Sequence, residues 1–376
     1  MVAGAGTVGR RAVFCFAQDA SFAGGSMGHA HAESIVRVLR LAGRAGAPVV
    51  GFVESEGARM EEGVGALAGW GRVLRETTAL SGRVPQIAVV TGRSGGGGAY
   101  VPALTDFAVT TAAASTAGDG ASELVADGEG SAAVLVRELL AHLPQSAREQ
   151  PPRAVPEDPL VLDPSWPLPP AASAVYDVRE VARALVDGGR LVEVSPRSAR
   201  NVLTALCRVG GRPVGLIANQ PLHLGGAIDA AAAQKAARLV STCDAFGLPL
   251  VVLVDTPGCP PRGRRQAAGS IDRGSALVRA FAQATVPKLT VVLRRAYGEG
   301  FIAMNPAALG ADLALAWPGA EVGILERPAA DCPREHLSAR AAAREGHIDE
   351  VVEPVETRGR IEASLGALTA ARAPSA

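Results

Sequence analysis

A run of four glycines, Gly95–Gly98, is the part of this sequence best suited to chemistry. It follows the apolar stretch QIAVV and precedes a segment that we predict to be helical. Glycine has no Cβ, so a ligand can approach the backbone closely, and φ angles closed to other residues become available. The exposed N–H groups at such a strand-to-helix turn can hold an anion. We therefore predict that the turn holds an anion or stabilises an oxyanion that develops during a reaction; the alternative is a tight turn that only packs a helix against a strand.

A second turn, around Gly298, has the sequence AYGEG, in which Glu299 interrupts the glycines. A carboxylate next to an oxyanion opposes its negative charge unless the carboxyl group is protonated or points away. The purely structural alternative therefore has more weight at this turn than at the first one. The GxxxxGK[ST] pattern of a phosphate-binding loop does not occur in the sequence, which argues against a site of that type.

The chain contains an internal repeat, in which three landmarks recur 201 positions apart (225 − 24, 255 − 54 and 298 − 97). The landmarks are a glycine pair before a helix, an acid that closes a strand, and a glycine-rich turn. The matched residues are Gly24 with Gly225, Glu54 with Asp255, and Gly97 with Gly298. A tandem duplication is the simplest explanation for three landmarks at one offset.

Continuous apolar runs alternate with helical patterns in both halves, as in VVGFV, IAVV, VGLIA, LVVLV and LTVVL. Strands of this kind are covered on both faces by crossing helices, which predicts an α/β fold with largely parallel sheets. A proline-rich stretch separates the halves, so we expect one domain over 1–150, a linker over 151–172 and a second domain over 173–376. No GxGxxG follows the first strand, so a dinucleotide site is poorly supported.

The composition excludes several classes of function. Basic and acidic residues number 37 each, so no net charge favours nucleic acid or an anionic membrane surface. The five cysteines form no CxxC or Cys/His cluster, and we expect no metal site. No apolar run reaches the about eighteen residues of a membrane span. The beginning of the chain lacks a signal-peptide pattern, and we expect a cytoplasmic protein.

Several longer motifs resemble a known family. They run in the same order as in that family over most of the chain: FAQDASFAGGSMGHAHAESI, ESEGARMEEGVGALAGWGRV, SGGGGAYVPALTDF, NQPLHLGGAIDAAAAQKAARLVSTCDAFGLPLVVLVDTPG, ATVPKLTVVLRRAYGEGF, GADLALAWPGAEVGI and REGHIDEVVEPVETRGRI. The sequence is similar to the carboxyltransferase (β) subunit of biotin-dependent acyl-CoA carboxylases of the propionyl-/acetyl-CoA type. The resemblance implies an α/β fold of tandem, duplicated crotonase-like domains, with the acyl-CoA side in the first and the biotin side in the second.

The resemblance also implies a reaction and its residues. In such enzymes carboxybiotin releases carbon dioxide, biotin takes the α-proton of a coenzyme A thioester, and the enolate captures the carbon dioxide. By position, Gly96 and Gly97 resemble the enolate hole, and Glu299 and Gly300 occupy the place of a small-residue pair that faces the biotin ureido oxygen. Contacts to the cofactor groups are implied for Gly24, Gly25, Gly57, Ala58, Tyr297 and Gly298.

The family further implies partners. Its active sites form between the first domain of one subunit and the second domain of another, which implies a homo-oligomer, a dimer or a hexamer. No lysine follows a methionine in the sequence, so the Met-Lys biotin attachment motif is absent. The carboxybiotin must therefore sit on a separate carrier, such as a biotinylated α-subunit.

Some features depart from the family pattern. Glu56 replaces a usual glycine, Glu299 enters the second turn, and short segments, ELVADGEGSAAVL and ILERPAADCPREH, replace longer family stretches. These departures favour keeping two alternatives. One is a biotin-independent decarboxylase of malonyl-type thioesters that uses only the first hole. The other is a non-catalytic scaffold subunit that retains the fold.

Overall fold

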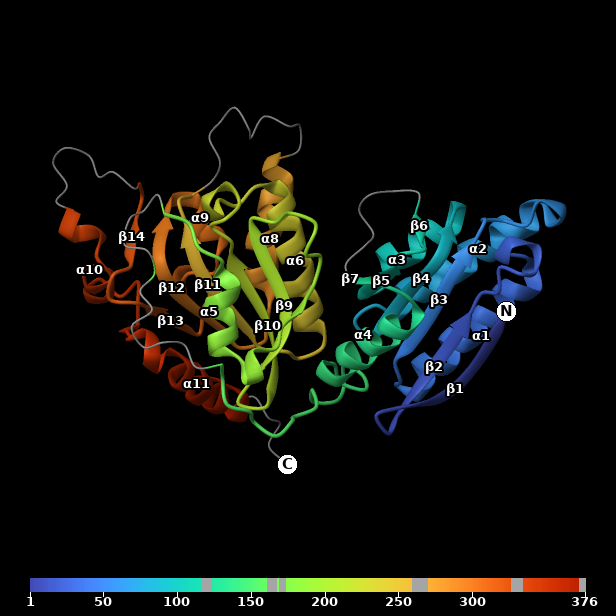
Figure 1. Ribbon diagram of the computed structural model, residues 1–376, viewed down its shortest axis with the longest axis horizontal. Helices are drawn as coiled ribbons and strands as arrows, with labels where there is room; N and C mark the ends of the chain where they lie inside the picture. The colour runs from blue at the N-terminus through green and yellow to red at the C-terminus, as the bar shows by residue number, and fades with distance from the viewer. Residues whose placement is uncertain (117–123, 161–167, 169–173, 259–269, 326–333, 372–376) are drawn as a thin grey trace. The chain divides into compact units, whose positions relative to one another are not determined.

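The computed structural model divides the chain into two compact units, Met1–Pro152 and Arg153–Ala376 (Figure 1). It describes residues 1–116, 124–160, 168, 174–258, 270–325 and 334–371. The two segments that we expect to be shorter than in the resembling family, which begin at Glu123 and Ile324, lie partly outside these residues. Each unit consists of a sheet with helices packed on it, and each has its own apolar core.

The sheet of the first unit has the order β1-β2-β3-β4-β5-β7, with β6 paired to β4. Its strands are β1 (Val2–Val8), β2 (Arg11–Ala17), β3 (Val49–Ser55), β4 (Gln86–Ser94), β5 (Phe107–Thr111), β6 (Ser115–Thr116) and β7 (Leu124–Ala126). Strands β1 and β2 form an antiparallel hairpin, whereas the pairings from β2 onward are parallel. The parallel order predicted from the apolar runs is confirmed for β3, β4 and β5.

Helices cover both faces of this sheet. They are α1 (His29–Ala45), α2 (Val64–Leu80), α3 (Tyr100–Leu104) and α4 (Glu129–His142), with short 3₁₀ helices η1 (Ala23–Gly25), η2 (Met60–Glu62) and η3 (Gly96–Ala99). Buried side chains of α1 and α2, among them Ile35, Leu39 and Trp70, pack on Phe16 and Val53 of the sheet. Helix α1 ends at Gly46, whose φ of 61° is the left-handed conformation typical of helix C-termini.

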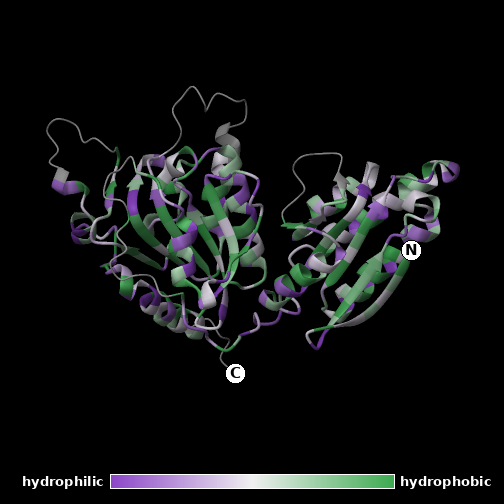
Figure 2. Cartoon of the chain, viewed as in Figure 1, coloured by the Kyte–Doolittle hydropathy of each residue, from purple (hydrophilic) through white to green (hydrophobic). Residues whose placement is uncertain are grey.

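The second unit repeats this plan with the strand order β15-β13-β12-β11-β10-β9-β8, and β14 pairs with β12. The strands are β8 (Val192–Glu193), β9 (Val202–Val209), β10 (Arg212–Asn219), β11 (Leu250–Thr256), β12 (Lys288–Tyr297), β13 (Leu313–Ala316), β14 (Glu321–Gly323) and β15 (Glu350–Val351). Strands β8, β9 and β10 are antiparallel neighbours, and the other pairings are parallel. Figure 2 shows hydrophobic residues concentrated on the inner strands.

The helices of the second unit are α5 (Val178–Leu185), α6 (Ala230–Ala245), α8 (Ser270–Gln283), α9 (Gly298–Ala303), α10 (Ala339–Arg344) and α11 (Thr357–Ala371). Buried residues of α5 and α11, such as Val181 and Ile361, pack with Leu216 of β10. Helix α6 lies on the opposite face, because a Cβ at Gly215 would meet the sulfur of Cys243 on α6. The sheet is thus a layer between two layers of helices.

The repeat is visible in the backbone, but its offset changes part of the way along. Strand β3 pairs Val49 with Gln86, and β11 pairs Leu250 with Lys288. The first members are 201 positions apart (250 − 49), whereas the second are 202 apart (288 − 86). One extra residue therefore lies between β11 and β12 compared with the first half.

This insertion corrects one pairing. Gly298 opens α9 with φ of 53°, and its counterpart is Gly96, which opens η3 with the same φ of 53°. Their separation is 202 (298 − 96). Gly97, which we matched to Gly298, instead corresponds to Glu299. The sequence comparison missed the inserted residue because two neighbouring glycines fit either alignment.

Part of the expected linker belongs to the second unit. The N–H of Ala154 donates to the carbonyl oxygen of Gly211 (2.9 Å), and the N–H of Gly188 donates to that of Asp158 (3.1 Å). Arg358 donates to the carbonyl oxygen of Glu157 (2.9 Å). Proline-rich backbone still offers its carbonyl groups as acceptors, so it can bind along a domain. Residues 161–167 and 169–173 of the expected linker lie outside the described residues.

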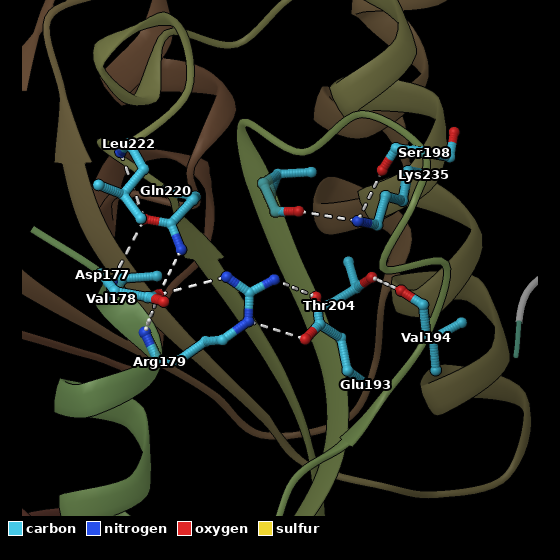
Figure 3. A network of polar contacts seen from close by, with 11 residues as sticks. Asp177, Val178, Arg179, Glu193, Val194, Ser198, Thr204, Gln220, Leu222 and Lys235 are labelled. Atoms are coloured by element: carbon cyan, nitrogen blue, oxygen red, sulfur yellow. Dashed lines mark hydrogen bonds and ion pairs between the residues drawn. The ribbon is translucent and has the colours of Figure 1, made fainter. Parts of the chain in front are cut away.

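A polar network at the beginning of α5 ties this helix to the sheet (Figure 3). Asp177 caps α5 by accepting from the N–H of Arg179 (3.0 Å), and Arg179 binds both carboxylate oxygens of Glu193 on β8. Gln220, just after β10, donates to Asp177 (2.6 Å). On α6, Lys235 donates to two backbone carbonyls, and burial lowers the pKa of its amine to about 8. The first four side chains bind one another and Lys235 binds the backbone at Ser198 and Val202, so these contacts hold elements of the second unit together.

Candidate functional site

The glycine turns lie where strands end. Ser55 at the end of β3 is in register with Ser94 at the end of β4, and Thr256 of β11 is in register with Ala296 of β12. Since the two strands of each pair are parallel, the turns that follow them leave the sheet of their own unit at its carboxyl edge. Carboxyl edges of parallel sheets are where ligands bind in α/β proteins.

Three turns are joined at this edge of the first unit. The N–H of Met27 donates to the carbonyl oxygen of Gly57 (2.8 Å), and the N–H of Glu56 donates to that of Gly24 (3.0 Å). The N–H of Gly95 donates to the carbonyl oxygen of Ser55 (2.9 Å). The structure therefore brings together the first-half residues that the sequence pointed to: Gly24, Gly25, Gly57, Ala58, Gly96 and Gly97.

At several of these positions a side chain is excluded, either because it would collide with a neighbouring backbone or because φ is positive. A Cβ at Gly25 would collide with the carbonyl oxygen of Glu54, and Gly25 has φ of 67°. Gly57 has φ of 116°. A Cβ at Gly96 would lie 3.4 Å from the Cα of Gly57. The backbones therefore approach as closely as they do because side chains are missing.

The N–H groups of Gly96 and Gly97 are available to a ligand. Among the described residues, neither group donates a hydrogen bond, whereas the next N–H along, that of Gly98, donates to Gly95 (3.0 Å). Gly96 is exposed and Gly97 is partly exposed. Two adjacent unpaired donors at the first turn of a helix are the arrangement that stabilises an oxyanion.

The second unit has the same joined turns. A Cβ at Gly226 would collide with the carbonyl oxygen of Asp255, as at Gly25, and Gly258 has φ of 111°, as at Gly57. A Cβ at Gly300 would lie 2.7 Å from the backbone of Gly258. Sequence reasoning missed Gly258, although its offset of 201 from Gly57 (258 − 57) was a signal that could have found it. Tyr297, Gly298, Glu299 and Gly300 are brought together here.

The two side chains of the second turn differ in exposure. Glu299 is exposed. Tyr297 is only 1% exposed, and its hydroxyl group donates to the carboxylate of Glu321. The backbone of this turn therefore matches the first turn, while the Tyr297 side chain is engaged in packing the unit.

The sequence reasoning also missed a buried ion-pair cluster beside the second turn. Asp255 is fully buried and accepts from Nε of Arg294 (3.0 Å) and Nε of Arg295 (2.7 Å). Arg295 also donates to the carbonyl oxygen of Gly225 (3.0 Å), which links the cluster to the glycine turn. Two adjacent arginines inside an apolar strand were the available signal, because buried charges need a partner.

The first unit lacks that cluster. The counterpart of Asp255 in the first unit is Glu54, which is half-buried and accepts a hydrogen bond from the hydroxyl group of Thr91 (3.4 Å). Gly92 stands at the position equivalent to Arg294 (294 − 92 = 202). The two halves therefore use this strand-end acid differently: in the second half it holds two arginines, and in the first half it is open to other partners.

Arg59, a candidate for binding CoA phosphates, has several partners within the first unit. It donates to the carbonyl oxygen of Ser26 (3.0 Å) and to Glu62 (2.9 Å), and its guanidinium lies 5.4 Å from the ring centre of Phe22. Glu62 also accepts from the N–H of His29 (2.5 Å), and this bond lowers the pKa of Glu62. The N-terminus of α1 is therefore already capped by a carboxylate of the chain itself.

The described residues contain no group of three or more histidines, cysteines, aspartates and glutamates that could hold a metal ion. No helix among them has both the length and the apolar character needed to cross a membrane.

Comparison with known proteins agrees with the sequence motifs. The family model for the carboxyl transferase domain matches residues 1–118 and 112–331. The methylmalonyl-CoA decarboxylase subunit alpha of Veillonella parvula is 36% identical over 420 residues, covering 99% of this chain and 82% of that protein. The propionyl-CoA carboxylase beta chain of Roseobacter denitrificans is 34% identical, covering 98% of this chain and 82% of the relative.

Solved structures give the same result. The crystal structure of the transcarboxylase 12S hexamer with hydrolysed methylmalonyl-coenzyme A superimposes with a TM-score of 0.94 at 34% identity, over 100% of this chain and 82% of that one. The prediction of a tandem crotonase-like α/β fold is confirmed by these neighbours. The chain belongs to the carboxyl transferase domain family.

Proposed function

We propose that this protein moves a carboxyl group from carboxybiotin to the α-carbon of a short acyl-CoA through an enolate. The observation that carries the proposal is the pair of unpaired N–H groups at Gly96 and Gly97, on a turn whose glycines are required by contact. Relatives named as propionyl-CoA carboxylase beta chain and methylmalonyl-CoA carboxyltransferase 12S subunit support it.

In this mechanism the first unit binds the thioester. The N–H groups of Gly96 and Gly97 donate to the thioester oxygen and stabilise its negative charge as the α-proton leaves. Donors fixed before the reaction need no reorganisation, and losing one such donor typically costs about 3–4 kcal/mol of transition-state stabilisation. Gly24, Gly25, Gly57 and Ala58 line the neighbouring turns and let the CoA chain approach the backbone.

The second unit would hold the biotin ring. Carboxybiotin supplies the carbon dioxide and the base when it is bound. The turn at Gly298 has the φ of the Gly96 turn, and in the corrected pairing Gly298 and Glu299 are the equivalents of Gly96 and Gly97. The backbone of this turn, from Gly298 to Gly300, would therefore face the ureido oxygen, and it includes the expected pair Glu299 and Gly300. The carboxylate of the exposed Glu299 adds negative charge nearby.

The partners of this reaction follow from the same chemistry. A biotinylated α-subunit or another carrier chain delivers the biotin, because this sequence has no Met-Lys attachment motif. A homo-oligomer is supported by the hexamer of the 12S neighbour. We place the protein in the cytoplasm, where acyl-CoA is available; the free thiols of Cys15, Cys207 and Cys243 suit a reducing compartment.

The test supplies purified protein with acetyl-, propionyl-, malonyl- or methylmalonyl-CoA, with and without a carboxylated biotin carrier, and follows the products by mass spectrometry. The expected result is carboxylation of acetyl- or propionyl-CoA only when the carrier is present. Failure to carboxylate any acyl-CoA with carriers from several related complexes would contradict the proposal and favour the scaffold alternative.

A second candidate is a biotin-independent decarboxylase of malonyl-type thioesters, and Glu299 is the observation that favours it. Decarboxylation gives the same enolate and needs only the first turn. Here malonyl- or methylmalonyl-CoA would release carbon dioxide without any carrier. Glu299→Gly distinguishes the candidates, because removing this charge should raise carrier-dependent transfer by about three- to tenfold and leave carrier-free decarboxylation unchanged.

Glu56 is expected to weaken binding of the CoA thioester. A Cβ at Gly24 would lie 2.5 Å from the Glu56 carboxylate, which places this charge directly on the turn, and Arg93 is 3.6 Å from it. Since CoA is anionic, Glu56→Gln should lower KM by about two- to fivefold at low salt and less at high salt. The control is Glu61→Gln, on an exposed neighbouring residue; equal effects of both changes would contradict this role.

A further inference from the structure

The indole of Trp70 packs directly against the Gly96–Gly97 turn. Trp70 lies on α2, is 4% exposed, and belongs to the core that also contains Met27 and Val101. A Cβ at Gly97 would lie 2.5 Å from Cγ and Cδ2 of the indole and 3.0 Å from Cδ1. A Cβ at Gly98 would lie 3.4 Å from Cη2. The ring therefore runs along the turn, with its pyrrole part under Gly97 and its benzene edge under Gly98.

The turn is confined from a second direction as well. Gly57, on the turn after β3, is the nearest neighbour of Gly96, with its Cα 3.4 Å from a Cβ built there. Gly97 has no positive φ, so its need for glycine comes from the indole alone. The position of the two N–H groups is thus set by contact with Trp70 on one side and Gly57 on the other.

The indole carries a cost that packing alone does not explain. Its Nε1–H is buried and has no hydrogen-bond partner among the described residues. A buried unsatisfied donor is destabilising, and a phenylalanine or leucine would avoid it. What the indole offers instead is a flat, rigid surface long enough to support two consecutive glycines. An aliphatic side chain offers no flat ring surface of this kind.

We propose that Trp70 is the positioning residue of the oxyanion turn. By packing against the turn, it fixes the N–H groups of Gly96 and Gly97 where they reach the thioester oxygen, and it does not itself touch the substrate. The expected effect of Trp70 on the rate rests on the proposed enolate chemistry. The expected effect of Trp70 on the position of the turn does not depend on that chemistry.

The experiment compares Trp70→Leu, Trp70→Phe and Val73→Ala. Val73 lies three residues further on α2 in the same core, 1% exposed, and is not among the nearest neighbours of the turn glycines, so it controls for lost packing. Trp70→Leu should lower kcat by about 10- to 100-fold with KM changed less than about twofold, because misplaced donors act on the transition state. Trp70→Phe keeps a flat ring and should retain activity within about fivefold of wild type.

Amide hydrogen exchange gives a readout that needs no activity. Exchange in a peptide spanning residues 94–100 should become at least about tenfold faster in Trp70→Leu and stay near the wild-type rate in Val73→Ala. Each variant is measured at the same number of degrees below its own melting temperature. Equal exchange in the two variants, or an unchanged kcat in Trp70→Leu of an active enzyme, overturns the inference. An inactive wild type contradicts the proposed function, and the exchange experiment then still decides the role of Trp70.

Discussion

Gly97→Ala is expected to reduce the enolate-forming activity by about 10²–10³-fold, because displacing a donor should have the effect of losing one donor from an oxyanion hole. The added methyl group would lie 2.5 Å from two atoms of Trp70, which is buried and cannot move aside freely. The turn must shift instead, and both N–H groups shift with it. Steady-state rates with a carboxylated carrier, and carrier-free release of carbon dioxide from malonyl-CoA, measure the loss.

Gly71→Ala is the matched control for this change. Gly71 lies on the same helix as Trp70, and a Cβ there would meet nothing within 4 Å. In a helix this change should leave activity intact and stabilise the protein by about 0.5–1 kcal/mol. If Gly97→Ala retains full activity, the turn is not the oxyanion hole, and the purely structural alternative for Gly95–Gly98 is correct.

Asp255→Asn is expected to destabilise the second unit by about 3–5 kcal/mol. The change removes the charge that Arg294 and Arg295 both contact, and all three side chains are at least 92% buried. Because the cluster also reaches the carbonyl oxygen of Gly225, the glycine turn should loosen at the same time. Urea unfolding, followed by a probe in the second unit, measures the change in free energy.

The internal repeat supplies the control for this second result. Glu54 occupies the equivalent strand end, is half-buried, and has no arginine among its described hydrogen-bond partners. Glu54→Gln should therefore cost less than about 1 kcal/mol. Similar losses for the two changes would mean that the strand-end acid has the same structural role in both halves, contrary to the asymmetry described above.

Much of this architecture was predictable from the sequence because it depends on short-range patterns. Apolar runs identified β3, β4, β10, β11 and β12, and the glycine pairs identified turns that the backbone indeed forms with positive φ. The chain divides after Pro152, and Ala154 and Asp158, which lie within the proline-rich stretch, bind the second unit.

Other features depend on which residues meet in three dimensions. Nothing in the spacing of Trp70 and Gly97 reveals that the indole lies against the glycine, because α2 and η3 are brought together only by packing. The inserted residue before β12 was hidden by neighbouring glycines, so Gly97 was matched with Gly298. The partner of Arg294 and Arg295 depended on strand register, which places Asp255 beside them.

The two equivalent positions, Gly97 and Glu299, differ in how freely they can change. At Gly97 any side chain meets Trp70, so a viable replacement requires a second, compensating substitution on α2. Glu299 is exposed and already carries a side chain, so a single substitution can be accepted there. Epistasis therefore restricts change at Gly97 more strongly than at Glu299. Among descendants of one ancestor, specificity for the carboxyl donor should diversify sooner than the chemistry of the enolate.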